Sequence, residues 1–192
     1  MKKAQSTIIG FILVTAIAVV IISTTMFWAR PLIERAQDQQ EVNRLEQKFL
    51  ELHQSIKKVA SEQGALSLPF DISRGIIVLG SNNTINYQGQ FNIIQPTPRK
   101  LVFGNNTAEI IPLGTEEPAY LFEQGAIEFN LHYRIVNDSG SCHKIKLLPG
   151  GQAGAGAGSH TIRLIWKAEN TSASIPSGCS NLTEQLVEFN VA

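Results

Sequence analysis

The sequence of 192 residues lacks an excess of either charge. Its 16 Lys and Arg side chains equal its 16 Asp and Glu side chains, so the formal net charge at pH 7 is zero. Nucleic-acid-binding domains usually carry a basic surplus, and disordered tails often carry blocks of like charge. We therefore expect no nucleic-acid partner and no charged, disordered tail.

Sequence motifs for catalysis are also missing. No Gly-x-Ser-x-Gly motif occurs. Gly150–Gly158 lacks the Gly-Lys-Ser/Thr ending of a phosphate-binding loop, so we interpret it as a flexible loop. Glu116 and Glu117 precede Pro118, and we interpret them as solvated turn residues. We expect no catalytic residue, no cofactor and no enzymatic activity.

Metal ligands are few and scattered. No pair of histidines has His-x-x-x-His spacing among His53, His132, His143 and His160. The two cysteines, Cys142 and Cys179, form either a disulfide, which we favour, or two buried free thiols. A disulfide would stabilise the fold by about 4 kcal/mol on the chain-entropy model and would brace the loop that contains the Gly-rich segment. A zinc site built from both cysteines with His143 and His160 remains an alternative.

What the sequence does have is a long apolar run near its start. Ala4–Ala29 contains no charged residue and lies between Lys3 and Arg30. As a helix, Thr7–Trp28 would be roughly 33 Å long, enough to cross a bilayer core of about 30 Å. The apolar stretch exceeds the 7–15 residues usual for a cleaved secretory signal. Phe27 and Trp28 stand at its end, as in an aromatic belt, so we predict a transmembrane helix.

A second, amphipathic segment follows at once. Pro31 predicts a kink, because it cannot donate to the carbonyl oxygen of Phe27. Helical periodicity then continues to Gly64, with an apolar stripe at alternating spacings of three and four residues: Val42, Leu45, Phe49, Leu52, Ile56 and Val59. This stripe packs either on the chain's own β domain, which we favour, or on neighbouring chains.

The remainder predicts many short strands separated by turns. The expected strands are Leu66–Ile72, Gly75–Leu79, Thr84–Gln88, Phe91–Ile94, Lys100–Phe103, Ala108–Pro112, Ala126–Val136, His143–Leu148, His160–Lys167 and Gln185–Val191. In Ala126–Val136 the alternation places Ile127, Phe129, Leu131, Tyr133 and Ile135 on one face. We predict an α+β fold, in which a long, kinked N-terminal transmembrane helix packs on a C-terminal antiparallel β-sandwich head.

Five Asn-x-Ser/Thr sequons also lie in this polar part, and some of them are expected by chance. They are Asn82, Asn105, Asn137, Asn170 and Asn181. Sequons and a disulfide both suit a domain outside the cytoplasm. Lys2 and Lys3 favour a cytoplasmic N-terminus, whereas Arg30 and Arg35 oppose it. We therefore expect the N-terminus inside and the head outside.

The start of the chain resembles archaeal type IV pilin-like proteins. The stretch KKAQSTIIGFIL is similar to their class III signal peptide, a short basic leader followed by an apolar helix that begins near a Ser. The resemblance implies a leader at residues 1–4, cut between Ala4 and Gln5 by a prepilin-type signal peptidase. Ile9 stands where bacterial pilins carry Glu, and the archaeal sequences with this type of opening also lack that Glu.

The resemblance also implies a domain order and a role. A transmembrane or filament-core helix is expected at 5–29, an amphipathic helix at 30–63 and a head at 64–192. The protein would be a structural or accessory subunit of a pilus-like surface filament, inserted in the membrane before assembly, and its head could serve adhesion. Its partners would be the membrane, the peptidase and other pilin subunits. The alternative is a membrane-anchored β domain that does not assemble and that binds a surface ligand or protein partner.

Overall fold

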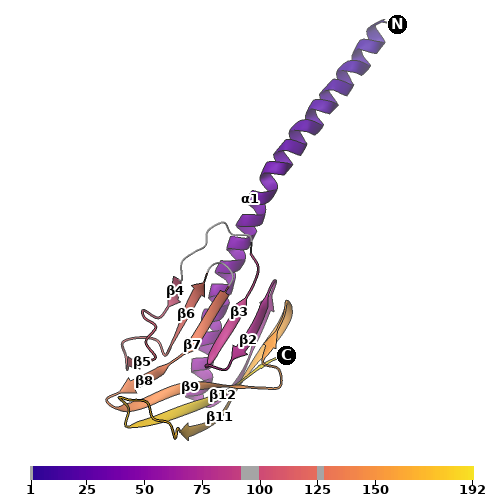
Figure 1. Cartoon of the computed structure of the whole chain (residues 1–192). Helices are drawn as coiled ribbons and strands as arrows, with labels where there is room; N and C mark the ends of the chain where they lie inside the picture. The colour runs from indigo at the N-terminus through magenta and orange to yellow at the C-terminus, as the bar shows by residue number, and fades with distance from the viewer. Residues whose placement is uncertain (1, 92–99, 125–127) are drawn as a thin grey trace. The chain divides into compact units, whose positions relative to one another are not determined.

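The computed structural model describes residues 2–91, 100–124 and 128–192, with residues 2–9 as backbone alone (Figure 1). It divides into two compact units, Met1–Glu41 and Val42–Ala192. We call the second unit the head. Residues 92–94 and 126–127, which belong to two of the expected strands, lie outside the described residues.

One helix, α1, extends from Lys2 to Glu62 and contains Pro31. Pro31 therefore does not end the helix, although its ring removes one backbone donor. The helix ends one residue earlier than the glycine signal predicts. Gln63 adopts the left-handed conformation, with φ of 54°, and Gly64 donates its N–H to the carbonyl oxygen of Val59 at 3.3 Å.

The head contains two six-stranded sheets. The first has the strand order β1-β11-β12-β9-β8-β5, with the bounds Ala65–Ile72, Gly158–Thr171, Asn181–Val191, Ser141–Pro149, Ile135–Asp138 and Ile110–Pro112. The second has the order β10-β2-β3-β7-β6-β4, with the bounds Gly154–Ala155, Ile76–Gly80, Thr84–Gln88, Glu128–Tyr133, Ala119–Gln124 and Lys100–Phe103. The long helix and the β-rich head establish the α+β class.

Most neighbouring strands are antiparallel, but two pairs in the first sheet are parallel. They are β9 with β12 and β5 with β8. The first arises because β12 enters the sheet between β9 and β11, which run in opposite directions. The sandwich is therefore rich in antiparallel pairs without being purely antiparallel.

The apolar stripe of α1 lies in the core of the head. Its six side chains are between 0% and 3% exposed, and they belong to one cluster with residues of both sheets. Phe49 is central to this cluster, since its ring centroid lies 5.9 Å from that of Phe70 on β1, 6.3 Å from Tyr87 on β3 and 5.7 Å from Phe129 on β7. The stripe thus packs on the chain's own β domain, which confirms the first of the two alternatives.

The single strand expected over Ala126–Val136 is wrong. Its described part is two strands in different sheets, β7 and β8, and the chain changes sheets at Arg134. Tyr133, Arg134 and Ile135 are all buried, which breaks the alternation of a half-buried strand. The physical reason is that the guanidinium of Arg134 satisfies backbone carbonyl groups at this crossing.

Two strands were missing from the expectation, β6 and β10. β6 has no alternating pattern, because four of its six residues are buried and they do not alternate. β10 lies in the Gly-rich segment and pairs with β2 through Gly154 and Ala155. A Cβ atom on Gly154 would meet the carbonyl oxygen of Ile77 at 2.7 Å, so glycine permits this close approach. The interpretation of Gly150–Gly158 as only a flexible loop is therefore corrected.

Candidate functional site

The apolar half of α1, residues 10–28, is the first candidate. Its large hydrophobic side chains are between 52% and 83% exposed, and none of its most hydrophobic 18-residue window is buried. The mean hydropathy of that window is 2.3. Water is a poor solvent for such a surface, so this half is suited to a bilayer or to other apolar helices.

Three threonine hydroxyl groups within the apolar half are satisfied by the helix itself. The hydroxyl groups of Thr15, Thr24 and Thr25 each donate to a carbonyl oxygen four residues earlier, at 2.8–3.0 Å. A hydroxyl bonded in this way leaves no free donor in hydrocarbon. These threonines are therefore compatible with a membrane environment.

The residues at the two ends of this segment are placed only in part. Ala4 and Gln5, the predicted cleavage junction, lie in α1, where the backbone alone is described. At the other end, Arg30 pairs with Glu34 at 3.0 Å, and both side chains are exposed. Charged side chains thus reappear in the helix at Arg30, soon after the apolar half ends.

The disulfide is the second feature of the head that bears on function. Cys142 on β9 is bonded to Cys179, and their Cα atoms are 5.7 Å apart. The bond joins the start of β9 to the segment that precedes β12, where Leu182 pairs with Cys142. A zinc site at these cysteines is excluded, since the bond occupies both sulfur atoms.

This bond does not brace the Gly-rich segment, contrary to expectation. It lies where β9 begins, whereas the Gly-rich segment follows the end of β9 at Pro149. At that end, Gly150 donates its N–H to the carbonyl oxygen of Phe189 at 2.7 Å. The Gly-rich segment is held instead by such backbone bonds and by the β10–β2 pairing.

The sequons differ in how their asparagine side chains are placed. Four are exposed: Asn82, Asn105, Asn170 and Asn181. Asn137 is half-buried and engaged, because its Nδ2 donates to the carbonyl oxygen of Gly178 at 3.1 Å and its Oδ1 accepts from the N–H of Gly140 at 2.8 Å. Attachment of a glycan to Asn137 would disturb these contacts, whereas the exposed Asn82 only accepts a long hydrogen bond, of 3.4 Å, from the hydroxyl of Ser81.

Residues 104–118, which we call the strap, contain β5 and are anchored by Arg134. Its buried guanidinium donates to the carbonyl oxygen of Asn106 at 2.6 Å and to that of Glu117 at 3.0 Å. The Glu116 carboxylate lies 3.0 Å from Arg134 Nη2 and is mostly buried. Glu116 is therefore the partner of a buried cation, and its interpretation as a solvated turn residue is wrong.

A second cluster joins the strap to α1. His53 is buried, with Nδ1 3.1 Å from the hydroxyl oxygen of Tyr133 and Nε2 3.2 Å from a carboxylate oxygen of Glu117. Lys57, one turn further along α1, donates to the same oxygen of Glu117 at 2.6 Å. Sequence reasoning missed this cluster, although His53 follows Leu52 on the apolar side of the helix, a position where a buried polar group needs partners.

Burial and charge displace the acid–base equilibria of this cluster. Desolvation lowers the pKa of His53 below its ordinary value of 6.5, more strongly than Glu117 raises it. The hydrogen bond from Lys57 is the main reason that the pKa of Glu117 lies below its ordinary value. Burial raises the pKa of Tyr133 well above 10.0. At neutral pH the cluster therefore holds a neutral imidazole, a carboxylate and a neutral phenol.

The other histidines do not converge. His132 lies 2.9 Å from a carboxylate oxygen of Glu109, whose other oxygen accepts from Lys144 at 3.1 Å. His160 Nε2 lies 2.9 Å from the carbonyl oxygen of Gly156, and His143 is exposed. Within the described residues, no group of three or more His, Cys, Asp or Glu side chains could hold a metal ion.

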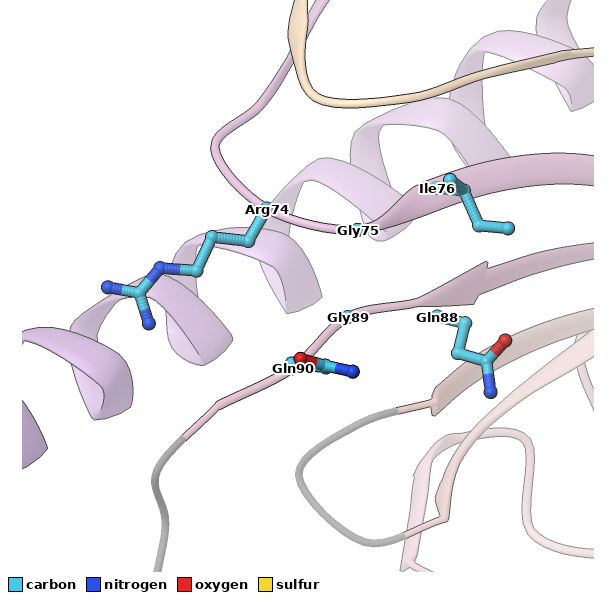
Figure 2. Close-up of a pocket in the computed structure, with 6 residues that line it drawn as sticks. All are labelled: Arg74, Gly75, Ile76, Gln88, Gly89 and Gln90. Atoms are coloured by element: carbon cyan, nitrogen blue, oxygen red, sulfur yellow. The ribbon is translucent and has the colours of Figure 1, made fainter.

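A pocket of about 640 Å³ opens where β2 begins and β3 ends. It is lined by Arg74, Gly75, Ile76, Gln88, Gly89 and Gln90. Figure 2 shows Arg74 pointing away from Ile76 and Gln88, so the polar side chains do not converge on one point. With two glycines and no carboxylate, thiol or imidazole among its lining residues, this pocket offers no acid–base pair.

Comparisons with known proteins do not assign the chain to a family. No protein-family model matches the chain, and neither a curated protein nor a solved structure matches it significantly. The structure itself defines a class: within the described residues the chain has one candidate membrane-spanning helix, near its N-terminus, and a disulfide-bonded β head.

Proposed function

We propose that this protein is a structural or accessory subunit of an archaeal type IV pilus-like surface filament, held in the membrane before assembly. The observation that carries the proposal is the apolar half of α1: no described part of the chain covers its side chains, and the same helix continues into the core of the head. A subunit of this kind needs one apolar surface that lipid covers before assembly and other helices cover afterwards.

The basic start of the chain supports a cytoplasmic leader. Lys2 and Lys3 would hold the leader at the anionic inner membrane surface, each contributing roughly 1 kcal/mol. Ala4 is small enough for the cleft of a membrane peptidase. The disulfide and the exposed sequons of the head favour the opposite side of the membrane, so we propose N-terminus inside and head outside.

The energetics of assembly also suit this helix. Transfer from lipid to a bundle of identical helices exchanges one apolar environment for another, so the hydrophobic term nearly cancels. Close packing between helices then decides the balance, and small residues promote it. The apolar half supplies Gly10, Ala16, Ala18 and Ser23. This role needs no catalytic group.

The test is the N-terminus of the mature protein. Sequencing of the chain from membrane and filament fractions should give Gln5 as the first residue, and filament preparations should contain the chain. An Ala4→Phe variant should retain Met1 and remain in the membrane, whereas the matched Ala36→Phe variant at an exposed position of α1 should be cut normally. An intact Met1 in the native protein, or a cut after Ala29, would refute the proposal.

The competing function is a membrane-anchored β domain that does not assemble. One observation favours it. The head buries all six side chains of the apolar stripe of α1, so Val42–Glu62 has no apolar stripe left to pack against neighbouring chains. A chain that is cut at Gln5 but absent from every filament preparation would support this function.

A further inference from the structure

His53 occupies an enclosed position between α1, the strap and β7. Tyr133 on β7 faces its Nδ1, and Glu117 on the strap faces its Nε2. The ring of Phe103 on β4 lies 4.8 Å from the imidazole, centroid to centroid, and contributes no polar group. Among the described residues, the charged groups that act on His53 are Glu117 and Lys57. Arg134, next in sequence to Tyr133, is paired with Glu116.

The two contacts require one particular tautomer. The carboxylate of Glu117 can only accept, so Nε2 must carry the proton in this bond. Nδ1 of the neutral ring is then an acceptor, and the hydroxyl of Tyr133 donates to it. Both ring nitrogens are satisfied in this arrangement, and so is the hydroxyl of Tyr133, which is buried.

A second proton cannot be added to His53 without loss. Protonated Nδ1 is a donor, so the hydroxyl oxygen of Tyr133 can only accept from it, and the O–H proton of Tyr133 is left buried without an acceptor. The imidazolium would also be buried with a carboxylate that Lys57 already neutralises in part. Protonation is much easier once the strap moves aside and water reaches the ring.

We propose that α1 and the strap form an acid-opened clasp, closed by neutral His53 between Tyr133 and Glu117 and opened when His53 takes up a proton. Because the opened form binds one more proton than the closed form, acidification shifts the equilibrium toward it, by up to tenfold per pH unit below 6.5. Arg134 also holds the strap at Asn106, so the opening breaks its bonds to Glu117 without requiring the sheets to separate. This clasp concerns the head by itself and does not depend on the proposed filament role.

The molecule contains a matched control for the clasp. His132, Glu109 and Lys144 form a second His–Glu–Lys group, with contacts of 2.9 and 3.1 Å, and the ring of Tyr120 stacks on its imidazole at 5.2 Å, centroid to centroid. His132 is also more exposed than His53, at 15% against 2% for the side chains. Because this group lies nearer the surface and, among its described contacts, holds no part of α1, it should not open the strap in acid.

The experiment is NMR spectroscopy of the full-length chain in detergent micelles, with ¹⁵N-labelled histidine. At pH 7.5 the imidazole of His53 should be the Nε2–H tautomer. Hydrogen-exchange protection of the Arg134 amide, which donates to Pro118, should fall up to tenfold per pH unit below 6.5, after correction for intrinsic exchange. Protection of the Ser180 amide, which donates to Gly140 near the disulfide, should stay constant.

Variants then decide the cause. His53→Gln should abolish the acid-dependent loss of protection at Arg134, and His132→Gln should leave it unchanged. If His53→Gln does not fold, Glu117→Gln serves instead, since it keeps an acceptor for Nε2 and should move the titration of His53 to lower pH. An Nδ1–H tautomer, constant protection at Arg134 in the native protein, or an unchanged loss in His53→Gln would overturn the proposal.

Discussion

The two halves of α1 share one helical backbone but bury their side chains in different ways. In residues 10–28 the large apolar side chains face outward on all sides of the helix, and no described part of the chain covers them. In Val42–Glu62 the apolar side chains form one stripe, and the two sheets cover it completely. Helix formation is thus common to both halves, while stability comes from the bilayer in one and from protein packing in the other.

This contrast shows how the two halves can respond to different perturbations. A change in the buried half should alter the unfolding of the head and leave membrane attachment intact. A change in the apolar half should alter membrane attachment and leave the head folded.

The largest effect is expected from Phe49→Ala. Phe49 is fully buried and packs against aromatic rings of both sheets, so its removal should leave a cavity and lower the free energy of unfolding of the head by about 3–5 kcal/mol. Urea denaturation followed by tryptophan fluorescence and circular dichroism would measure this loss. The matched control is Phe27→Ala in the apolar half, where the side chain is 83% exposed and head stability should change by less than about 0.5 kcal/mol.

A slightly smaller loss is expected from removal of the disulfide. Without it the unfolded head gains chain entropy, so Cys142→Ala/Cys179→Ala should lower head stability by about 2–4 kcal/mol. Thermal unfolding would show the change. The variant should still sediment with membranes and resist extraction by carbonate, and its release from membranes would contradict the independence of the two halves.

A charge placed in the apolar half should have the opposite pattern. Val19→Arg puts a guanidinium near the centre of the apolar stretch, at a cost of about 3 kcal/mol for insertion, and should shift the chain from the membrane fraction to the soluble fraction. Head stability should stay unchanged. Gln54→Arg on the exposed side of the buried half is the control, and it should leave both membrane attachment and head stability unaffected.

Much of this architecture was predictable from sequence because its periods are long and consistent. The apolar stretch and the stripe from Val42 to Val59 each extend over several turns, and no neighbouring signal contradicts them. Strands such as β3 were predicted with their observed ends, because turn residues bound an alternating run. In these elements local preference and tertiary packing agree.

The errors lie where tertiary contacts override local pattern. Arg134 looks like an outward residue of an alternating strand, but it is buried by carbonyl groups from the distant strap. Glu116 and Glu117 look like turn residues beside a proline, yet they bind Arg134, His53 and Lys57. A single sequence does not show these long-range partners, so neither the strap nor the His53 cluster was expected.

The smallest effect concerns pH and separates two opposing groups within the buried part of the head. The lowered pKa of His53 means that its contribution to stability is complete well above 6.5 and is lost as the pH falls, by at most about 1 kcal/mol between pH 6.5 and 5.5. Burial raises the pKa of Glu123 above 4.5, so this group contributes stability that is recovered on acidification and offsets part of the loss.

The difference between two proteins therefore isolates the histidine. The free energy of unfolding of the native head minus that of His53→Gln should decrease from pH 6.5 to 5.5. Glu123 titrates equally in both proteins, so its contribution cancels in this difference. Because the pKa of Glu117 is lowered, the stability that this carboxylate contributes is lost only below pH 4.5, outside this window. A constant difference across the window would show that His53 binds protons equally in the folded and the unfolded head, so that its folding environment does not lower its pKa. Phe27→Ala should follow the native pH profile throughout, because its substitution lies in the half of α1 that the head does not bury.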